Sequence, residues 1–466
     1  MHIEQIYTGC LAQGAYYIRS ENEAAIIDPL RETLPYTSRA EKDGVKIKYI
    51  FETHFHADFV SGHVDLAKKT GAKIVFGPSA KTNYESYVAR DGEEFKIGKI
   101  TIKVLHTPGH TLESSTFLLL DENNIPHSIF SGDTLFIGDV GRPDLAIKSD
   151  LTQEDLAGML FDSLQTKIKT LPDNVIVYPA HGAGSACGKN MSKETFDTLG
   201  NQKQKNYALV MNSKKDFITE LTTGILPPPQ YFSKNAMLNK TGYSAFDDVM
   251  EKGSKALSPE EFETIASSGD TLVLDVRKPD EFAKAHIPNS IFIGIDGQFA
   301  PWVGALITDL KQPILLITAA GREEEVVMRL SRVGYDNCVG YLKGGIESWK
   351  NAGKEVSSIT SISAEEFSGK INSGINILDV RRPGEYSNQH LKDVPNLPLD
   401  FINDWTKTTD KNKEYFIHCA GGYRSMIAAS ILKARGFDKL VDVAGGFAAI
   451  AKTNAPLTEI STCSKS

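Results

Sequence analysis

The sequence predicts a multidomain α/β protein, and three observations lead to that prediction. Within the first 215 residues, each histidine or aspartate of interest falls just after a short β-rich run. The second half repeats itself after about 100 residues. Each repeat alternates β-rich runs with helical patterns, which is typical of a parallel sheet covered by helices. We therefore expect a β-rich domain at 1–215, a connecting segment at 216–257, and two α/β domains at 258–355 and 356–460.

Length and composition agree with several globular domains. A chain of 466 residues is too long for one ordinary core. The net charge is −8 and no basic run exceeds two residues, which argues against a general binder of nucleic acid or membrane surfaces. The N-terminus lacks the pattern of a signal peptide, and the longest apolar runs are strand-sized. Five cysteines, odd in number and far apart, fit a reducing cytoplasm, where we expect the protein to act.

Histidines and aspartates stand directly after the β-rich runs of the first half. Loops held by a rigid sheet commonly carry functional side chains. A single histidine is more often a hydrogen-bonded loop residue, but one group at each strand–loop junction, with HxHxD in the first, indicates a metal site. The candidates are His54, His56, Asp58 and His63 in THFHADFVSGH, His110 in HTPGHT, Asp133 in FSGDTLF, and His181 in YPAHGAG.

These motifs, in this order, resemble the metallo-β-lactamase superfamily. The resemblance implies an αββα sandwich for residues 1–215, with metal ligands on its loop rim. Within that superfamily, FSGDTLFIGDVGRPDL and AHGAGSACGK resemble the persulfide dioxygenases rather than the hydrolases. The resemblance assigns the metal ligands to His54, His110 and Asp133.

Phe59 bears on the number and kind of metal ions. In two-zinc members such as glyoxalase II, a histidine follows the aspartate that corresponds to Asp58, and both help to hold the second metal. Phenylalanine has no lone pair to donate, so the second site is incomplete here. Two imidazoles and one carboxylate, with open positions opposite, suit a mononuclear Fe(II) that must take both substrate and O₂. Zinc is the alternative cofactor.

The remaining members of the cluster have secondary roles in this interpretation. By the same resemblance, His56, Asp58 and His181 orient the ligands, and they stay open as alternative ligands. His63 lies several residues past the cluster and is expected to be structural.

Two neighbours of the motifs have two readings each. Arg142 in GDVGRPDL either binds the thiol-bearing part of the substrate, as the resemblance implies, or forms a salt bridge within its loop. Cys187, six residues after His181, either relays sulfur or is a small buried residue.

The repeat in the second half consists of two copies of one small domain. LDVRKPDEF at 274–282 returns as LDVRRPGEY at 378–386, and ITAAGREEE at 317–325 aligns with IHCAGGYRS at 417–425. The period is far beyond that of a solenoid. The LDVR motifs place an aspartate and an arginine at each strand end, and we expect these pairs to be structural. They are Asp275 with Arg277 and Asp379 with Arg381.

The loop IHCAGGYRS carries the second chemical signal. Cys419 follows a β-rich run and precedes a glycine-rich turn and a helix expected to begin near Ser425. Inward-pointing N–H groups, the helix N-terminus and the positive charge of Arg424 all stabilise a thiolate. The loop resembles that of rhodanese, in which four residues separate the cysteine from an arginine or lysine. Related phosphatase loops hold one more residue, so sulfur is favoured over phosphate.

The rhodanese resemblance implies persulfide exchange through this loop. Cys419 would take up a sulfane sulfur and hand it to an acceptor such as sulfite, while Arg424 binds the oxyanion. The residues expected to contact the substrate are Gly421, Gly422, Tyr423 and Ser425.

The first copy departs from the rhodanese pattern. Ala319 stands where Cys419 stands in the second copy, and Glu324 stands where Arg424 stands. Alanine is no nucleophile and glutamate repels an oxyanion, so we expect this copy to be inactive and to serve as a spacer or interface. Cys338 is expected to be structural, and Cys463 lies in a C-terminal tail.

Together the motifs predict Fe(II)-dependent oxidation of a low-molecular-weight persulfide by O₂ to sulfite, coupled to thiosulfate formation through Cys419. Such an enzyme would detoxify sulfide, and the family resemblance favours a homo-oligomer. Three rivals stay open: a zinc-dependent thioester hydrolase of the glyoxalase II kind with an accessory sulfurtransferase, a persulfide sensor, and the same enzyme with its rhodanese step reversed. No residue identifies the thiol that carries the persulfide.

Overall fold

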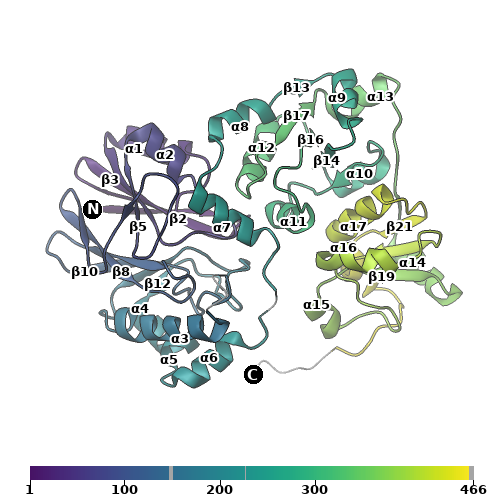
Figure 1. Ribbon diagram of the computed structural model, residues 1–466. Coiled ribbons are helices and arrows are strands. Elements are labelled where there is room, and N and C mark those ends of the chain that lie inside the picture. Colours follow the sequence, from purple (N-terminus) through teal and green to yellow (C-terminus); the bar gives the residue numbers. More distant parts are fainter. Residues whose placement is uncertain (146–150, 226, 461–466) are drawn as a thin grey trace. The chain divides into compact units, whose positions relative to one another are not determined.

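The computed structural model describes residues 1–145, 151–225 and 227–460 (Figure 1). The chain divides into two compact units. The first comprises Met1–Asp248 with Met328–Gly334, and the second comprises Val249–Val327 with the described part of Tyr335–Ser466. Cys463 lies outside the described residues. Among those that are described, no helix is long and apolar enough to cross a membrane.

Two six-stranded sheets form the centre of the first unit. The first sheet has the order β1-β2-β3-β4-β5-β6, with β1 (His2–Thr8), β2 (Gln13–Ser20), β3 (Glu23–Ile27), β4 (Lys46–Glu52), β5 (Lys73–Phe76) and β6 (Tyr87–Val88). The second has the order β12-β11-β10-β9-β8-β7, with β7 (Glu94–Ile97), β8 (Ile100–His106), β9 (Ser115–Leu120), β10 (Pro126–Gly132), β11 (Ile176–Pro179) and β12 (Asp197–Thr198). Helices α1 (Leu34–Asp43) and α2 (His63–Thr70) cover the first sheet.

Alternation of side chains along the strands explains the layers. In β2, Tyr16 faces the core between the two sheets, whereas Tyr17 packs into the core shared with α1 and α2. In β9, Phe117 faces the inter-sheet core and Leu118 faces the opposite side. Successive residues of a strand point to opposite faces, so each buried strand contributes to two cores.

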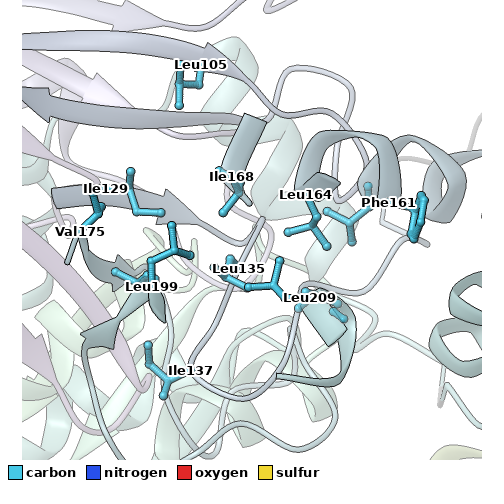
Figure 2. Packing of buried hydrophobic residues seen from close by; sticks show 14 of the residues in the cluster. Leu105, Ile129, Leu135, Ile137, Phe161, Leu164, Ile168, Val175, Leu199 and Leu209 are labelled. Atoms are coloured by element: carbon cyan, nitrogen blue, oxygen red, sulfur yellow. The ribbon is translucent and has the colours of Figure 1, made fainter. Parts of the chain in front are cut away.

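The outer face of the second sheet is covered by the helices that follow it in sequence. Figure 2 shows Ile129 of β10 and Leu199 in the same cluster as Leu164 and Phe161. The elements of this layer are α3 (Gln153–Ser163), the π-helical turn Leu164–Ile168, α4 (Leu199–Lys205), α5 (Tyr207–Val210) and α6 (Lys214–Thr222). Thr152 and Asp155 form a capping box that fixes the start of α3. The result is the predicted αββα sandwich.

The segment 216–257 differs from the connecting stretch that its turn-forming residues suggested. It contains α7 (Phe232–Thr241) and α8 (Phe246–Gly253) in addition to most of α6. Its glycines and prolines fall between these helices or at their ends. Most of the segment belongs to the first compact unit, where α7 contributes buried polar contacts.

The second unit holds two parallel sheets, one for each repeat. The first copy has the order β13-β17-β16-β14-β15, with β13 (Ala256–Leu257), β14 (Leu272–Asp275), β15 (Ile291–Phe292), β16 (Ile314–Ile317) and β17 (Cys338–Leu342). Its helices are α9 (Pro259–Ala266), α10 (Pro279–Lys284), α11 (Phe299–Leu306), α12 (Glu323–Ser331) and α13 (Gly345–Asn351).

The second copy follows the same plan. Its sheet has the order β18-β21-β20-β19, with β18 (Thr360–Ile362), β19 (Asn376–Asp379), β20 (Tyr415–His418) and β21 (Leu440–Val443). Its helices are α14 (Ala364–Lys370), α15 (Pro383–Asn388), α16 (Ile402–Trp405), α17 (Tyr423–Ala434) and α18 (Gly446–Ile450). Helix α17 begins two residues before the expected Ser425, and Gly436 follows its end with φ +85°. The predicted fold class, a sandwich followed by two parallel-sheet α/β domains, is confirmed.

Candidate metal centre and sulfur-transfer loop

Three of the predicted metal ligands converge at one end of the sandwich. His54 follows β4, His110 lies between β8 and β9, and Asp133 follows β10. Asp133 Oδ2 lies 3.8 Å from His54 Nε2 and 3.4 Å from His110 Nε2. All three side chains are buried, and their ligand atoms lie within 4.8 Å of one another. The sheets therefore bring together the two imidazoles and the carboxylate that the sequence singled out.

The donor atoms of these residues suit a cation. His110 Nδ1 lies 2.8 Å from the carbonyl oxygen of Arg142, which fixes the proton on Nδ1 and leaves the Nε2 lone pair free to bind a metal. Burial lowers the pKa of His54 well below its usual value, so its imidazole is neutral. Asp133 Oδ2 receives no hydrogen bond from the described residues although it is buried. An orphaned buried carboxylate oxygen between two imidazoles is the arrangement that a divalent ion satisfies.

His181 and Asp58 stand beside this cluster. His181 Nδ1 lies 2.8 Å from Asp133 Oδ1, and His181 Nε2 lies 2.8 Å from Asp58 Oδ2. Burial would lower the pKa of His181, but the two carboxylates outweigh it and raise that pKa well above its usual value. His181 thus donates to Asp133 from the side, which orients Oδ2 toward His54 and His110.

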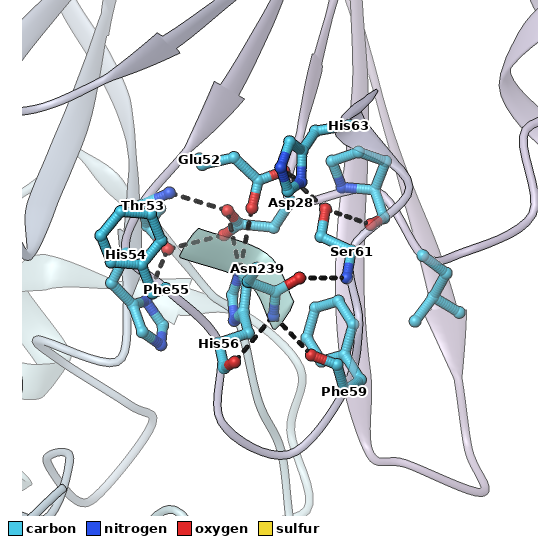
Figure 3. Close-up of polar contacts among 12 residues, drawn as sticks. Asp28, Glu52, Thr53, His54, Phe55, His56, Phe59, Ser61, His63 and Asn239 are labelled. Atoms are coloured by element: carbon cyan, nitrogen blue, oxygen red, sulfur yellow. Dashed lines mark hydrogen bonds and ion pairs between the residues drawn. The ribbon is translucent and has the colours of Figure 1, made fainter. Parts of the chain in front are cut away.

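His56 turns away from the three ligands. Its Nε2 lies 3.1 Å from Asp28 Oδ1 and 3.7 Å from Glu52 Oε2, as Figure 3 shows. Its ring packs on Phe59 with 4.3 Å between ring centroids. Phe59 is fully buried, so it fills the position where a second metal would need a ligand with a lone pair. Asp28 and Glu52 belong to no motif, and no periodic pattern in the sequence indicated that they contact His56.

Asn239 on α7 holds the HxHxD loop in shape, and sequence reasoning missed it. Its Nδ2 donates to the carbonyl oxygens of His56 and Phe59, both at 2.8 Å, and its Oδ1 accepts from the backbone N–H of Ser61 at 2.9 Å (Figure 3). The His63 Nε2 atom lies 2.6 Å from the Tyr84 hydroxyl, which agrees with a structural role. A lone asparagine some 180 residues along the chain carries no signal that links it to this loop.

Arg142 and Cys187 lie near the cluster with other partners. Arg142 forms a two-pronged pair with Asp144 at 2.6 and 2.7 Å, and it also donates to the Ala186 carbonyl at 3.2 Å. This ion pair is the salt bridge that was one of the two expected roles of Arg142. The other role, binding the substrate, stays a prediction. Cys187 is 1% exposed, and burial, then Asp58 and Asp133, raises the pKa of its thiol well above the usual value. A protonated, buried thiol fits the small-residue reading better than the relay, which stays a prediction.

The second site is the loop between β20 and α17. The backbone N–H of Gly422 donates to Cys419 Sγ at 3.1 Å, and Gly422 has φ +98°. The Cys419 carbonyl accepts from the N–H of Phe447, so the loop rests against α18. Donation from the backbone to sulfur at a helix start is the environment expected for a reactive thiol.

The charged and polar neighbours of Cys419 have defined partners. Arg424 pairs in two-pronged fashion with Glu385 of α15 at 2.6 and 2.7 Å. Ser425 Oγ donates to the Gly422 carbonyl at 3.2 Å. The hydroxyl of Tyr423 donates to the carbonyl oxygen of Gly294 in the first copy at 2.6 Å, so this side chain contributes to the contact between the copies. Its contact with substrate stays a prediction. Glu385 was not foreseen, although it lies in the repeated motif.

The corresponding loop of the first copy lacks this chemistry. Arg322 pairs with Glu325 at 2.7 Å and with Asp296 at 2.6 Å. Thr318 and Ala319 line a cavity of about 440 Å³ in this copy. The expected match of Ala319 with Cys419 is wrong by one residue: Ile317 pairs with Asp275 as His418 pairs with Asp379, so Thr318 stands at the thiol position. Glu323, Glu324 and Glu325 open helix α12. Cys338 is buried, with Sγ 3.8 Å from the Gly253 carbonyl oxygen, as a structural cysteine would be.

Comparison with known proteins assigns both halves of the chain. Residues 8–181 match the Metallo-beta-lactamase superfamily, and residues 258–352 and 363–453 each match the Rhodanese-like domain. The mitochondrial persulfide dioxygenase ETHE1 of Homo sapiens is 30% identical over 215 residues, which are 46% of this chain and 76% of that protein. The chain belongs to the metallo-β-lactamase superfamily. Its combination with two rhodanese-like domains, predicted from the sequence, is confirmed.

Other members differ in their named activity. A probable hydroxyacylglutathione hydrolase of Schizosaccharomyces pombe is 32% identical over 181 residues, which are 38% of this chain and 66% of that protein. A solved metallo-beta-lactamase of Staphylococcus aureus subsp. aureus COL is 33% identical, covers 74% of this chain and 98% of its own, and superimposes with a TM-score of 0.64. Membership in the superfamily therefore leaves the reaction to be argued from the site.

Proposed function

We propose that the first unit oxidises a low-molecular-weight persulfide and that the second copy of the rhodanese-like domain transfers sulfane sulfur to the product. In the first reaction RSSH, O₂ and H₂O give RSH, sulfite and two protons. In the second, sulfite accepts a sulfur atom from another persulfide and becomes thiosulfate. The observation that carries the proposal is the cluster of His54, His110 and Asp133 beside a buried Phe59.

These three residues would hold a ferrous ion. Such an ion supplies open coordination positions and the one-electron couple through which O₂ reacts with a closed-shell sulfur compound. The residues around it fix the donors in place: the Arg142 carbonyl holds His110, Thr53 Oγ1 lies 2.9 Å from His54 Nδ1, and His181 binds Asp133 Oδ1. Asp28 and Glu52 bind the His56 side chain away from the cluster, which limits the metal ligands to two imidazoles and one carboxylate.

Cys419 would carry sulfur in the second reaction. Its thiolate attacks the outer sulfur of a persulfide, the S–S bond of the substrate breaks, and the released thiolate takes up a proton. The Cys419 persulfide then passes its outer sulfur to sulfite, which restores the thiolate without net oxidation. The N–H group of Gly422 stabilises the sulfur anion in both steps. A homo-oligomer and a cytoplasmic location stay predictions.

The test measures O₂ uptake on adding a glutathione persulfide to protein of known iron content. We expect uptake in proportion to bound iron, with thiosulfate from the wild type and sulfite from Cys419→Ser. Cys338→Ser, the same substitution at a cysteine without a cradle, should still give thiosulfate. An iron-loaded protein that takes up no O₂ would contradict the dioxygenase reaction.

One observation favours a second candidate, a zinc-dependent thioester hydrolase with an accessory sulfurtransferase. Asp58 and His181 still lie 2.8 Å apart, as two ligands of a second metal would, and one relative is named as a probable hydroxyacylglutathione hydrolase. The zinc-loaded protein should then hydrolyse S-lactoylglutathione, and Phe59→His should raise the number of zinc ions bound from one toward two. Under the dioxygenase proposal the zinc protein is inactive on the thioester.

A further inference from the structure

A cavity of about 470 Å³ opens beside the sulfur-transfer loop, and both rhodanese-like copies line it. The first copy contributes Pro279, Asp280, Ala283 and Lys284 of α10, and the second contributes Ile359, Ser361, Gly421, Gly422, Met426, Asp442, Ala444 and Gly445. Gly422, which lines the cavity, donates its N–H to Cys419 Sγ, so one residue separates the cavity from the reactive sulfur.

Direct hydrogen bonds hold α10 in this wall. The N–H of Ile359 donates to the Ala283 carbonyl at 2.9 Å, at the start of β18. The N–H of Phe292 donates to Ser430 Oγ of α17 at 2.9 Å, and Tyr423 donates to Gly294. Both copies belong to one compact unit, so the inactive copy forms a fixed part of the cavity next to the active thiol.

Asp442 is an unusual residue in the lining. It is 4% exposed, and its Oδ2 accepts a weak hydrogen bond from Ser361 Oγ at 3.3 Å. Its Oδ1 is buried and, within the described parts of the chain, accepts no hydrogen bond. Buried carboxylates are ordinarily paired with a cation or fully hydrogen-bonded. A carboxylate left in this state on a cavity wall is suited to a ligand that brings a positive charge.

The other charges of the cavity leave this site negative. Asp280 and Lys284 lie 3.6 Å apart on α10 and are 68% and 78% exposed, so they form a neutralised pair in contact with solvent. The first copy has Tyr341 at the position that corresponds to Asp442. The carboxylate thus occurs in the second copy, whose loop holds Cys419, and the first copy has a neutral residue at that position.

We infer that this cavity binds the ammonium group of an aminothiol, with Asp442 as its counter-ion, while the thiol of that molecule exchanges sulfur with Cys419. The inference rests on the proposed sulfur transfer and specifies the class of thiol that takes part in it. In the exchange, the aminothiol sulfur attacks the outer sulfur of the Cys419 persulfide, the S–S bond to Cys419 breaks, and the aminothiol persulfide leaves. The sulfane sulfur keeps its oxidation state, and the thiol proton remains with the products.

The experiment compares two acceptors of similar size. Cysteamine carries an ammonium group and 2-mercaptoethanol carries a hydroxyl in its place. Full-length protein is first loaded with thiosulfate, which gives its outer sulfur to Cys419 and leaves as sulfite. The sulfite released measures the reactivity of Cys419 toward a donor that has no ammonium group. Transfer from the loaded protein to each thiol then gives a kcat/KM value for the wild type and for Asp442→Asn. Asp280→Asn, which removes the same charge at an exposed position of the same cavity, is the matched control.

We expect Asp442→Asn to lower kcat/KM for cysteamine about tenfold or more, since it removes a charge-assisted hydrogen bond. The value for 2-mercaptoethanol should stay within about twofold, and Asp280→Asn should change neither by more than about twofold. The ratio of kcat/KM for cysteamine to kcat/KM for 2-mercaptoethanol is compared between variants, so the intrinsic reactivity of the two thiols cancels. Equal losses for both thiols, or no loss for cysteamine, would overturn the inference.

A measurement on the wild type alone covers the case of an unfolded variant. Ethanolamine should inhibit transfer to cysteamine, whereas ethylene glycol at the same concentration should not. Inhibition by neither compound would overturn the aminothiol site. Absence of sulfite release during thiosulfate loading would instead overturn the sulfur transfer on which the site rests.

Discussion

The two rhodanese-like copies share a scaffold and differ in the loop that would do chemistry. Arg277 contacts Asp275 at 2.6–3.1 Å and the Ala285 carbonyl at 2.8 Å. In the second copy, Arg381 contacts Asp379 at 2.7–3.0 Å and the Gln389 carbonyl at 3.0 Å. The pair persists in a copy whose loop has no cysteine, so it belongs to the fold. The repeated LDVR motif therefore marks architecture, and only the loop marks activity.

The loops keep the same left-handed glycine and differ in the residue at the thiol position. In the second copy the left-handed residue is Gly422, with φ +98°, and its N–H reaches Cys419 Sγ. In the first copy the left-handed residue is Gly321, with φ +81°. The two sheets pair their strands in the same register, which makes Gly321 the counterpart of Gly422 and Thr318 the counterpart of Cys419.

The largest expected effect comes from moving the thiol between the copies. In a Cys419→Ser protein, sulfur transfer should fall about a thousandfold, because the nucleophile is lost. Adding Thr318→Cys should restore less than about 1% of the wild-type rate, since three glutamates at the start of α12 disfavour a sulfur anion. Sulfite release from thiosulfate measures both.

Adding Glu323→Arg to that graft sharpens the comparison, because Glu323 follows Thr318 by five residues as Arg424 follows Cys419. Glu324 and Glu325 remain at the helix start, so the rate should still be far below that of the wild type. Recovery to more than about a tenth would mean that these two side chains alone separate the two copies.

A smaller effect is expected from matched glycines behind the two loops. Gly446 has φ +55°, and a Cβ there would lie 2.5 Å from the Cys419 carbonyl oxygen. Gly345 has φ +59°, and a Cβ there would lie 3.5 Å from the Thr318 carbonyl oxygen. Each alanine costs about 1 kcal/mol in backbone strain. Gly446→Ala should also shift the loop and slow sulfur transfer about 10- to 100-fold.

Kinetics and denaturant unfolding of the two alanine variants separate these contributions. Gly345→Ala should lose stability while its rate of sulfur transfer stays close to that of the wild type. Equal slowing in both variants would mean that the contact with the Cys419 carbonyl is not what positions the thiol.

The smallest effect is a pH dependence confined to the copy with Asp442. Burial raises the pKa of Asp442 to about 6, and the nearby hydroxyls of Ser425 and Ser361 only partly offset it. A carboxyl whose pKa is higher in the folded than in the unfolded chain stabilises the fold below about pH 4 and loses that contribution as pH rises through about 6. The free energy of unfolding should therefore fall between pH 4 and 7 by an amount on the order of 2 kcal/mol that Asp442→Asn lacks.

Tryptophan fluorescence reports this transition without interference from the first unit. The three tryptophans of the chain, Trp302, Trp349 and Trp405, all lie in the second unit. The curves of the wild type and Asp442→Asn should lie closest at pH 4, where the protonated carboxyl resembles the amide, and separate toward pH 7 as the wild type loses stability. Parallel curves would contradict the assigned burial. Tyr341→Phe in the first copy is the control, with no change of slope expected.

The sequence predicted the features that repeat or alternate. The β-rich runs before His54 and Asp133 foretold the strands that end at the metal cluster, and the spacing of Cys419 and Arg424 foretold the loop. It could not foretell the side toward which His56 turns, because Asp28 and Glu52 reach it only through tertiary packing. Asn239 and Asp442 were missed for the same reason: neither belongs to a periodic pattern, and each acquires its role from residues distant in the chain.

The contact of Tyr423 with the first copy means that mutations in the first copy can affect the loop of the second. Gly297 lies against the Tyr423 ring, and a Cβ at this position would collide with it. Gly294 accepts the hydrogen bond from the same side chain. A mutation at Gly297 would therefore be selected against as a loss of sulfur transfer, although it changes a residue in a domain that has no catalytic groups of its own. The first copy is therefore expected to remain under selection because it contacts Tyr423 in the loop of the second copy.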